Sequence, residues 1–313
     1  MITNFLKKYK SNIILITFIT AFSMLFPFSI TIYKMESGKV KIYKPDMLGK
    51  TVVLNSGEEK ESIDVEMFIP LVLYSAISDE YEKETLKSMI VIFRTYILYS
   101  MGENESINAE DLGIPYTTYS ELEKKWGKNY EKKYMNTMKL LKETDNKVIM
   151  FNNKLIYPYY NEVSAGITNV GEFEYLQSVD TGWDKKAPNF ENTFYFTGDE
   201  ICKILKEKSE VFIENSDLVS KIILNMEENG IYVRSVTVGE KVIGSEDFKE
   251  MFSLLSTAFT FESFSDGYKF VTKGIGNGKG LSMFSTEEMA KEGKKFDEIL
   301  KFFYYGIEIK EIY

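Results

Sequence analysis

The chain lacks histidine, and this limits the side chains that could do chemistry. Its 313 residues include no histidine and one cysteine, which excludes serine–histidine and cysteine–histidine catalysis and the commonest zinc-ligand sets. Acid–base chemistry would have to come from Asp, Glu, Lys or Tyr. Cys202 lies in the apolar pattern ICKIL and is expected in the core. We therefore expect no metal site and no cofactor.

Arg94 interrupts an otherwise apolar run, LKSMIVIFRTYILYS, at residues 86–100. The apolar residues of this run recur at helical spacing on more than one face, which predicts a helix that is buried on most sides. A guanidinium is almost never fully buried unless it is paired. Arg94 is therefore expected either to form a structural ion pair at the edge of a core helix or to line a cleft.

The elements around this helix predict a mixed α+β fold with several antiparallel strands. The apolar stretch 66–78 leads into the core as a helix or a strand, with Pro70 inside it. The other predicted elements are strands at 39–43 and 51–54, one amphipathic helix at 120–142 capped by Ser120 and Glu123, a hairpin at 147–161 about Asn152 and Asn153, a helix capped by Thr197 and Glu200, and a strand-rich unit after residue 220 with a helix near Ser245.

The amino-terminal region has the pattern of a membrane anchor. Residues 11–33 carry no charge, which is long enough to cross a bilayer as a helix. Lysines at 7, 8 and 10 precede this run, so the positive-inside rule predicts a cytoplasmic tail at 1–10 and an extracytoplasmic domain at 36–313. A cleaved signal peptide is the alternative. The net charge of −9 argues against a nucleic-acid partner.

Several motifs, in order along residues 36–313, resemble the stage II sporulation protein D family, which also includes amidase-enhancer proteins. Leu86-Lys87 followed by Arg94-Thr95-Tyr96 resembles its signature helix. Ser164, Gly166 and Thr168 resemble its Ser-Gly-Gly-x-Thr segment, and EYLQSVDTGWD at 174–184 resembles its Tyr-Leu-x-Ser-Val stretch. The segment GIGNGKGLSMF at 274–284 is similar to its terminal glycine motif, with Asn277 in place of the histidine and Ser282 retained.

The resemblance implies an activity for which this chain lacks the expected proton donor. Active members of the family are peptidoglycan lytic transglycosylases, in which one carboxyl group acts as acid and then as base. In the family this acid lies eighteen residues before the signature arginine, and here that position is Ala76. Either Asp79 or Glu80 has taken over, or catalysis is lost. Loss is the preferred interpretation, because three or four residues displace a carboxylate by several ångströms.

The retained motif residues are candidates for binding the glycan strand. Lys87 and Arg94 could hold carboxylates of the wall polymer, or could be a solvated helix end and an ion pair. Ser164 and Thr168 could donate to sugar hydroxyls, or could fix their own loop. Tyr175 and Trp183 could offer ring faces to sugars, or could belong to the core. Gly166, Asn277 and Ser282 complete the predicted binding set.

Three functions remain open at this point. The first, which we prefer, is a membrane-anchored, non-catalytic member that binds peptidoglycan glycan strands beside other sporulation cell-wall proteins. The second is a lytic transglycosylase that uses Asp79 or Glu80. The third is an activator of a cell-wall amidase, as the enhancer branch of the family implies. The expected location is the cell membrane, crossed once, with the amino terminus in the cytoplasm.

Overall fold

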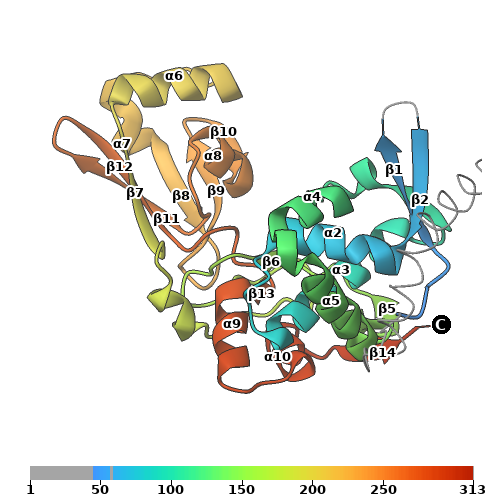
Figure 1. The fold of residues 1–313 in the computed structure, drawn as a ribbon. Helices are drawn as coiled ribbons and strands as arrows, with labels where there is room; N and C mark the ends of the chain where they lie inside the picture. Colours follow the sequence, from blue (N-terminus) through green and yellow to red (C-terminus); the bar gives the residue numbers. More distant parts are fainter. Residues whose placement is uncertain (1–44, 57–58, 313) are drawn as a thin grey trace, which may run out of the picture. The chain divides into compact units, whose positions relative to one another are not determined.

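The computed structural model describes residues 45–56 and 59–312 (Figure 1). The predicted tail, the predicted membrane helix at 11–33 and the predicted strand at 39–43 lie outside these residues. Among the residues that are described, no helix is both long and apolar enough to span a membrane. The described chain forms one compact unit that begins at Pro45.

The described chain begins with a small sheet that leads directly into a buried helix. Strands β1 (Thr51–Ser56) and β2 (Glu59–Asp64) are antiparallel, and β3 (Ser106–Asn108) lies parallel to β1 on its other side. Asp64 then caps α2 (Val65–Ala76) by accepting a hydrogen bond from the Glu66 amide. The stretch that the sequence left open between helix and strand is therefore a helix, and it contains Pro70.

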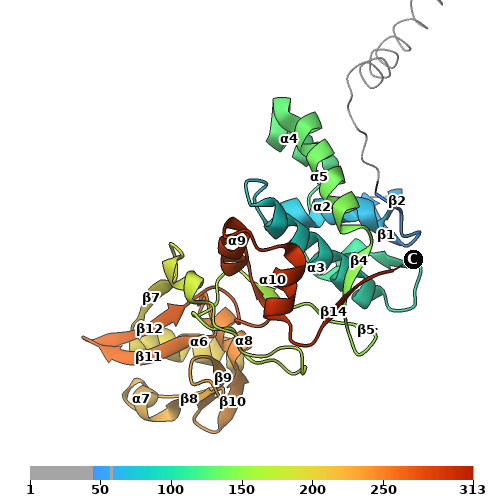
Figure 2. The ribbon, with the colours of Figure 1, turned by 90° about the horizontal axis from the view of Figure 1, so that it is seen from below.

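The predicted signature helix is confirmed as α3 (Lys83–Met101), and it is central to the packing. It contacts α2, α5 (Tyr130–Thr144), α9 (Met283–Lys291) and α10 (Phe296–Phe303). Figure 2 shows α9 and α10 beside α3. The side chain of Glu287 on α9 accepts hydrogen bonds from the Glu82 amide and the Thr85 hydroxyl, which ties the first turn of α3 to the carboxyl-terminal part of the chain.

The single helix predicted at 120–142 is wrong, because the chain forms two helices there. Helix α4 (Tyr119–Trp126) ends where Gly127 adopts φ +50°, a 3₁₀ turn follows at Gly127–Asn129, and α5 then begins. The capping box also lies two residues earlier than predicted, at Thr118 and Glu121. The apolar stripe still packs inward, since Leu122, Trp126, Met138 and Leu141 are buried.

The turn of the hairpin predicted at 147–161 is confirmed, but the hairpin is shorter than predicted. Its second strand ends at Leu155, and β6 (Tyr160–Asn161) instead pairs in parallel with β13 (Leu281–Ser282). Strands β4 (Lys147–Phe151) and β5 (Lys154–Leu155) are joined by Asn152 and Asn153, both at positive φ. The last strand, β14 (Glu308–Glu311), pairs antiparallel with the other edge of β4. Strand β14 thereby extends the sheet of β4, which packs against α3.

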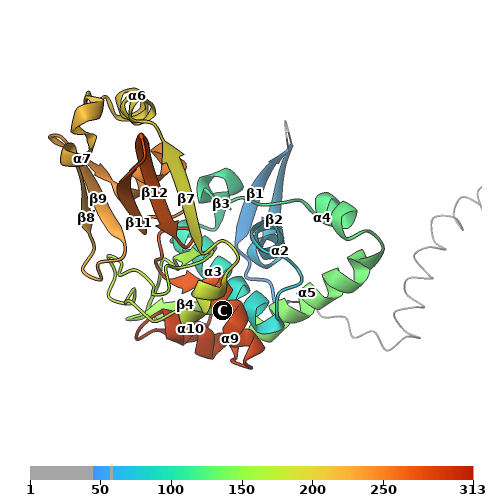
Figure 3. The same ribbon diagram turned by 90° about the vertical axis from the view of Figure 1, so that its left-hand side faces the viewer.

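Residues 191–273 hold two further antiparallel sheets (Figure 3). These residues also have their own apolar core. The sheet orders are β11-β12-β7 and β10-β9-β8. The capping box at Thr197 and Glu200 and the helix near Ser245 are confirmed. The elements are β7 (Glu191–Phe196), α6 (Gly198–Ser209), α7 (Leu218–Lys221), β8 (Ile222–Met226), β9 (Val233–Val238), β10 (Lys241–Gly244), α8 (Ser245–Met251), β11 (Phe259–Phe264) and β12 (Gly267–Lys273). The described fold is thus mixed α+β, as predicted.

Candidate functional site

Arg94 is sealed inside the fold, where it forms a bidentate ion pair with Glu66 of α2. Its Nε and Nη2 donate to the two carboxylate oxygens of Glu66, with Nη2 at 2.8 Å from Oε2. Its Nη1 donates to the carbonyl oxygen of Lys147 at 3.0 Å, and the side chain has no exposed surface. The interpretation of Arg94 as a structural ion pair is therefore confirmed. Its interpretation as a ligand of the wall polymer is wrong, because each guanidinium nitrogen is already occupied and no solvent reaches it.

Asp184 joins three of the predicted motif segments in a second buried centre. Its carboxylate accepts hydrogen bonds from the amide of Ser164, the hydroxyl of Ser282 and the hydroxyl of Ser285, at 2.7 to 2.9 Å. Burial raises the pKa of Asp184, although these hydrogen bonds partly offset the effect. Ser164 and Ser282 are also buried. The structure does bring these two predicted residues together, but their polar groups hold the fold and do not face a sugar.

The loop after Ser164 is fixed in a similar way. The Thr168 hydroxyl donates to the carbonyl oxygen of Gln177 and accepts from the Val179 amide, so it stabilises its own loop. Gly166 adopts φ +88°, which favours glycine. Tyr175 is buried and its hydroxyl accepts from the Tyr157 amide, so its ring belongs to the core. For Thr168 and Tyr175, the structure therefore supports the structural alternative: Thr168 fixes its own loop, and Tyr175 belongs to the core.

The terminal glycine motif packs tightly against the Ser164 loop. A Cβ atom at Gly274 would lie 2.4 Å from the carbonyl oxygen of Val163, and one at Gly278 would lie 2.1 Å from the Tyr232 hydroxyl. All four glycines from 274 to 280 have positive φ. Tight backbone turning therefore explains the glycines. Asn277 lies within this segment, partly exposed, and its Oδ1 accepts a hydrogen bond from the Lys279 amide.

The position of the missing acid lies at the end of a helix. Ala76 is the last residue of α2 and is partly exposed. Asp79 forms an ion pair with Lys133 of α5. The side chain of Glu80 is exposed, so water solvates its carboxylate. Neither acid stands at the position where the resemblance places the proton donor.

A cavity of about 390 Å³, here called the lysine pocket, lies between the α2–α3 connection and α5. Tyr74, Asp79 and Tyr81 line one side of it. Its charged residues are Lys83, Lys132, Lys133, Lys139, Asp79 and Glu143. Four cations against two anions leave an excess of two positive charges, although the whole chain carries −9. Burial raises the pKa of Tyr74 to about 12, so its hydroxyl stays neutral.

Lys87 lies next to this pocket and is committed to two carboxylates. Its Nζ lies 3.0 Å from Glu84 and 2.6 Å from Glu143. Burial works to lower the pKa of Lys87, but the hydrogen bonds to these two carboxylates outweigh it and raise the pKa. The side chain is only 13% exposed. Its role as a ligand of the wall polymer stays a prediction.

A second cavity, of about 640 Å³, is here called the balanced pocket. Asn277, Asn169, Tyr159, Tyr160 and Thr257 line it. Its charged residues are Arg234, Lys249, Lys279, Glu227, Glu246 and Glu250. Three cations match three anions, and two of the cations are already paired within the pocket, Arg234 with Glu227 and Lys249 with Glu246. This pocket therefore presents polar groups without a net charge.

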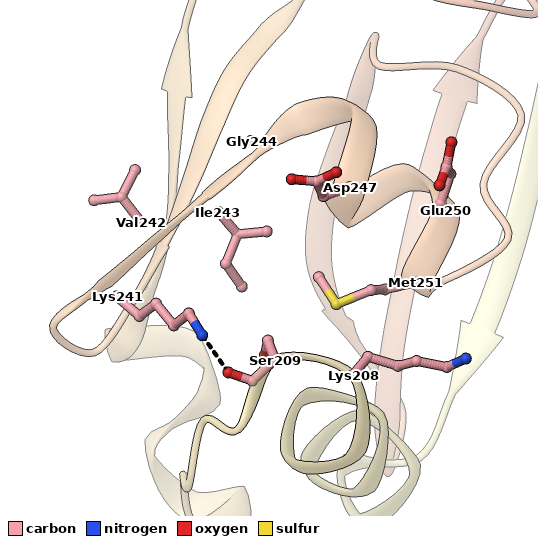
Figure 4. Close-up of a pocket in the computed structure, with 9 residues that line it drawn as sticks. All are labelled: Lys208, Ser209, Lys241, Val242, Ile243, Gly244, Asp247, Glu250 and Met251. Atoms are coloured by element: carbon pink, nitrogen blue, oxygen red, sulfur yellow. Dashed lines mark hydrogen bonds between the residues drawn. The ribbon is translucent and has the colours of Figure 1, made fainter. Parts of the chain in front are cut away.

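A third cavity, of about 540 Å³, lies between β10, α8 and the end of α6, and contains none of the predicted site residues (Figure 4). Lys241 lines this cavity and donates to the carbonyl oxygen of Ser209. Asp247 and Glu250 project from α8. Within the described part of the chain, no group of three or more His, Cys, Asp or Glu side chains is arranged to hold a metal ion.

Sequence reasoning missed the partners of the predicted residues and the face that forms the lysine pocket. Glu66 is an acid within an apolar run, and this was the same signal that singled out Arg94. Asp184 is the last residue of the 174–184 segment, and the sequence assigns it no role. The lysines of α5 carried no signal, because the charged face of an amphipathic helix has the same pattern with or without a ligand.

Comparison with known proteins identifies the family. Residues 55–151 match the family model described as Stage II sporulation protein (SpoIID). The chain is 30% identical over 292 residues to Stage II sporulation protein D of Bacillus subtilis (strain 168), covering 89% of this chain and 83% of that protein. It is 27% identical over 274 residues to the protein of the same name from Bacillus amyloliquefaciens, covering 83% and 78%. The motif segments form α3 and surround Asp184 in the structure. Because of the 30% identity over most of both chains, the chain belongs to the stage II sporulation protein D family.

Proposed function

We propose that this protein binds the glycan strands of peptidoglycan during sporulation and does not cleave them. The sporulation setting is supported by the names of its relatives. Binding is supported by the lysine pocket, and the loss of cleavage is supported by the residue at position 76. In this proposal the uncharged run at residues 11–33 anchors the protein in the membrane, with the described domain outside the cytoplasm.

The observation that carries the proposal is the methyl group of Ala76, where the resemblance predicts the catalytic acid. A lytic transglycosylase needs a proton donor at the leaving oxygen, and a general acid typically contributes about 10²- to 10⁴-fold in rate. Asp79 is paired with Lys133, and Glu80 is solvated. Neither acid stands at the position of the expected proton donor, so binding without cleavage is the function that these residues favour.

The chemistry of the lysine pocket matches the wall polymer. Glycan strands carry lactyl and peptide carboxylates beside neutral sugar hydroxyls. Lys83 and Lys132 are exposed lysines of the pocket and can pair with carboxylates, while Asn129 and Asn136 offer amide groups for hydroxyls. The pocket excess of two positive charges also attracts an anionic polymer at long range when the ionic strength is low.

The test combines sedimentation with purified sacculi and mass spectrometry of the released material. The full-length chain should sediment with sacculi, and no anhydro-muramyl ends should appear. Charge reversal at Lys83 and Lys132 (Lys83→Glu with Lys132→Glu) should weaken binding, whereas the same change at Lys203 and Lys206 on α6 should not. Failure to sediment would refute binding. Release of anhydro-muramyl products would refute the loss of catalysis.

A relocated acid is the second candidate, and one observation keeps it in the test. Burial raises the pKa of Tyr81, and the negative charges of Glu162 and Glu287 raise it further, so two carboxylates lie near this ring of the lysine pocket. Glu287 is held by α3, whereas Glu162 is exposed. If anhydro-muramyl products appear, Glu162→Gln, Asp79→Asn and Glu80→Gln will identify the acid, because only its loss abolishes them.

A further inference from the structure

Strand β10 has one open edge. In the described chain it pairs with β9 on one side and with no strand on the other. Val238 and Lys241 flank a two-residue turn in which Gly239 has φ +62°, so they form the hydrogen-bonded pair nearest the turn. Because hydrogen-bonded and non-bonded pairs alternate in an antiparallel ladder, the N–H and C=O of Val242 both point away from β9, toward the open edge.

The face of the sheet beside this edge carries an uncharged row of side chains. Thr237 is paired with both Ile223 and Val242, so the three residues lie side by side across the strands. Val242 is 63% exposed and Ile223 is 53% exposed. Edge strands are commonly protected by a charged side chain, but the lysine of β10, Lys241, is on the opposite face and donates to the carbonyl oxygen of Ser209. The edge is therefore suited to pairing with another strand.

The third cavity, of about 540 Å³, lies along the same edge, because all four residues of β10 line it. Figure 4 shows Ile243 turned toward Met251 of α8 and Val242 turned away. Successive side chains of a strand alternate between its two faces, so a strand added to this edge would place every second side chain over the cavity. Ile243 and Met251 supply apolar surface to receive such a side chain.

The charges of this cavity favour a strand that runs antiparallel to β10. Lys241 lies at the start of β10, whereas Asp247 and Glu250 project from α8, which begins directly after it. An antiparallel copy of β10 reverses this order, so Lys241 of each copy would lie near the acids of the other. The edge is thus complementary to itself about a two-fold axis, which is the requirement for a symmetric dimer.

We propose that β10 pairs with β10 of a second copy of this chain, antiparallel and with Val242 on the two-fold axis. Gly244 also faces the edge, but its carbonyl begins α8 as the N-cap, so Val242 alone has both of its backbone groups available. The Val242 N–H of each copy donates to the Val242 carbonyl oxygen of the other. The two three-stranded sheets thereby become one continuous sheet.

This register brings opposite charges together. Lys241 of one copy faces Ile243 of the other, one residue from Gly244. A Cβ atom at Gly244 would lie 3.5 Å from the Asp247 carboxylate, so Lys241 and Asp247 of different copies are neighbours. Glu240 precedes Lys241 in the turn and is exposed, so its carboxylate can remain in water.

The first test traps the contact with a disulfide. In a chain whose own cysteine is replaced (Cys202→Ala), Val242→Cys places two thiols across the axis, where facing β-carbons of paired strands lie about 4.5 to 5.5 Å apart. Oxidation by copper phenanthroline should convert most of the full-length chain into a covalent dimer. Ser263→Cys is the matched control, because Ser263 is exposed on the edge strand β11, next to the pair that flanks a two-residue turn. It should remain mostly monomeric.

The second test removes the backbone donor at the axis. Edge strands tolerate proline where its nitrogen faces solvent, so Val242→Pro should fold with nearly the wild-type melting temperature. Its dissociation constant, measured by sedimentation of the full-length chain in non-ionic detergent, should rise at least about tenfold, because both N–H donors across the axis are lost. Ser263→Pro makes the same change on β11 and should leave dimerisation unchanged.

The third test exchanges the charges. Lys241→Glu should weaken dimerisation about threefold to tenfold, since the contact occurs twice in the dimer. Lys241→Glu with Asp247→Lys should restore it, which a purely structural role of Lys241 within one chain does not predict. The inference is overturned if the wild-type chain is monomeric, if Ser263→Cys cross-links as readily as Val242→Cys, or if the exchanged variant is not restored. Dimerisation does not depend on sacculus binding, so failure of either result leaves the other standing.

Discussion

The motif residues and the pocket residues of this protein differ in what their polar groups do. Arg94, Ser164 and Ser282 carry the family resemblance, and each is buried with its partners inside the protein. Lys83 and Lys132 carry no motif, yet they line an open cavity. The residues that identify the family and the residues available to a ligand are thus largely separate sets.

The physical reason lies in desolvation. A buried charge is stable only when it is paired and hydrogen-bonded, so Arg94 could exchange Glu66 for a ligand only at a large cost. An exposed lysine loses little when it turns from water to a carboxylate. Motif residues should therefore govern stability, and pocket residues should govern binding. Each of the following predictions tests that separation.

Removing the partner of Arg94 should have the largest effect. Glu66→Ala leaves an unpaired guanidinium in the core and should lower the free energy of unfolding by about 3 to 5 kcal/mol, measured by urea denaturation. Glu61→Ala, an exposed acid on β2, should change it by less than about 0.5 kcal/mol. Replacing both partners, Glu66→Leu with Arg94→Met, should recover part of the loss. A small effect of Glu66→Ala would remove the basis for calling this region structural.

Asp184→Asn should have the next largest effect, with a defined pH dependence. The asparagine can no longer accept all of the hydrogen bonds from Ser164, Ser282 and Ser285, which should cost about 1 to 3 kcal/mol. Burial raises the pKa of Asp184 above 3.8, so the folded chain holds this proton more tightly than the unfolded chain. The stability from this group is complete below pH 3.8 and is lost as the pH rises through the folded-state pKa.

The measurement is urea denaturation of wild type and variant at several pH values. The difference in unfolding free energy should shrink as the pH rises from below 3.8, because only the wild type loses stability through this group. A difference that grows with pH would mean that the folded state favours the charged carboxylate. That result would contradict the role of burial at this centre.

The sequence predicted the hairpin turn and a helix cap of this fold, because residues close together in the chain determine these elements. The hairpin at Asn152 and Asn153 depends on two adjacent residues that tolerate positive φ, and the helix cap at Thr197 and Glu200 depends on residues three apart. The break at Gly127 was missed because the apolar stripe continues across it. Helical periodicity does not reveal a single residue at positive φ.

The candidate site was less predictable, because its geometry depends on contacts between distant segments. The resemblance placed Ser164 and Ser282 in one predicted binding set, but Asp184, which joins them in the structure, had no separate signal. Composition favoured an ion pair for Arg94 without naming its partner, 28 residues earlier in the chain. Whether a lysine faces a cavity or open solvent is decided by the neighbouring helices, and sequence pattern alone does not contain that information.

Charge reversal in the lysine pocket should weaken binding and leave stability almost unchanged, the opposite of what the two preceding variants should do. Lys83→Glu with Lys132→Glu should weaken sacculus binding about threefold to tenfold at low salt and less at high salt, since exposed charges are screened. Stability should change by less than about 1 kcal/mol. Lys203→Glu with Lys206→Glu on α6 makes the same change in net charge and should have no effect on binding. Equal losses for both pairs would mean that only total charge matters.

Tyr74 both lines the lysine pocket and makes a buried structural contact, and it therefore gives the smallest but most discriminating test. Its ring lines the lysine pocket, and its hydroxyl shares a buried 2.7 Å hydrogen bond with Thr137 of α5. Tyr74→Phe keeps the ring and should cost about 0.5 to 1.5 kcal/mol of stability, with sacculus binding almost unchanged. Thr137→Val removes the other partner and serves as the comparison. A large loss of binding in Tyr74→Phe alone would show that this hydroxyl reaches the ligand, and the separation between scaffold and pocket would then fail at the place where the two meet.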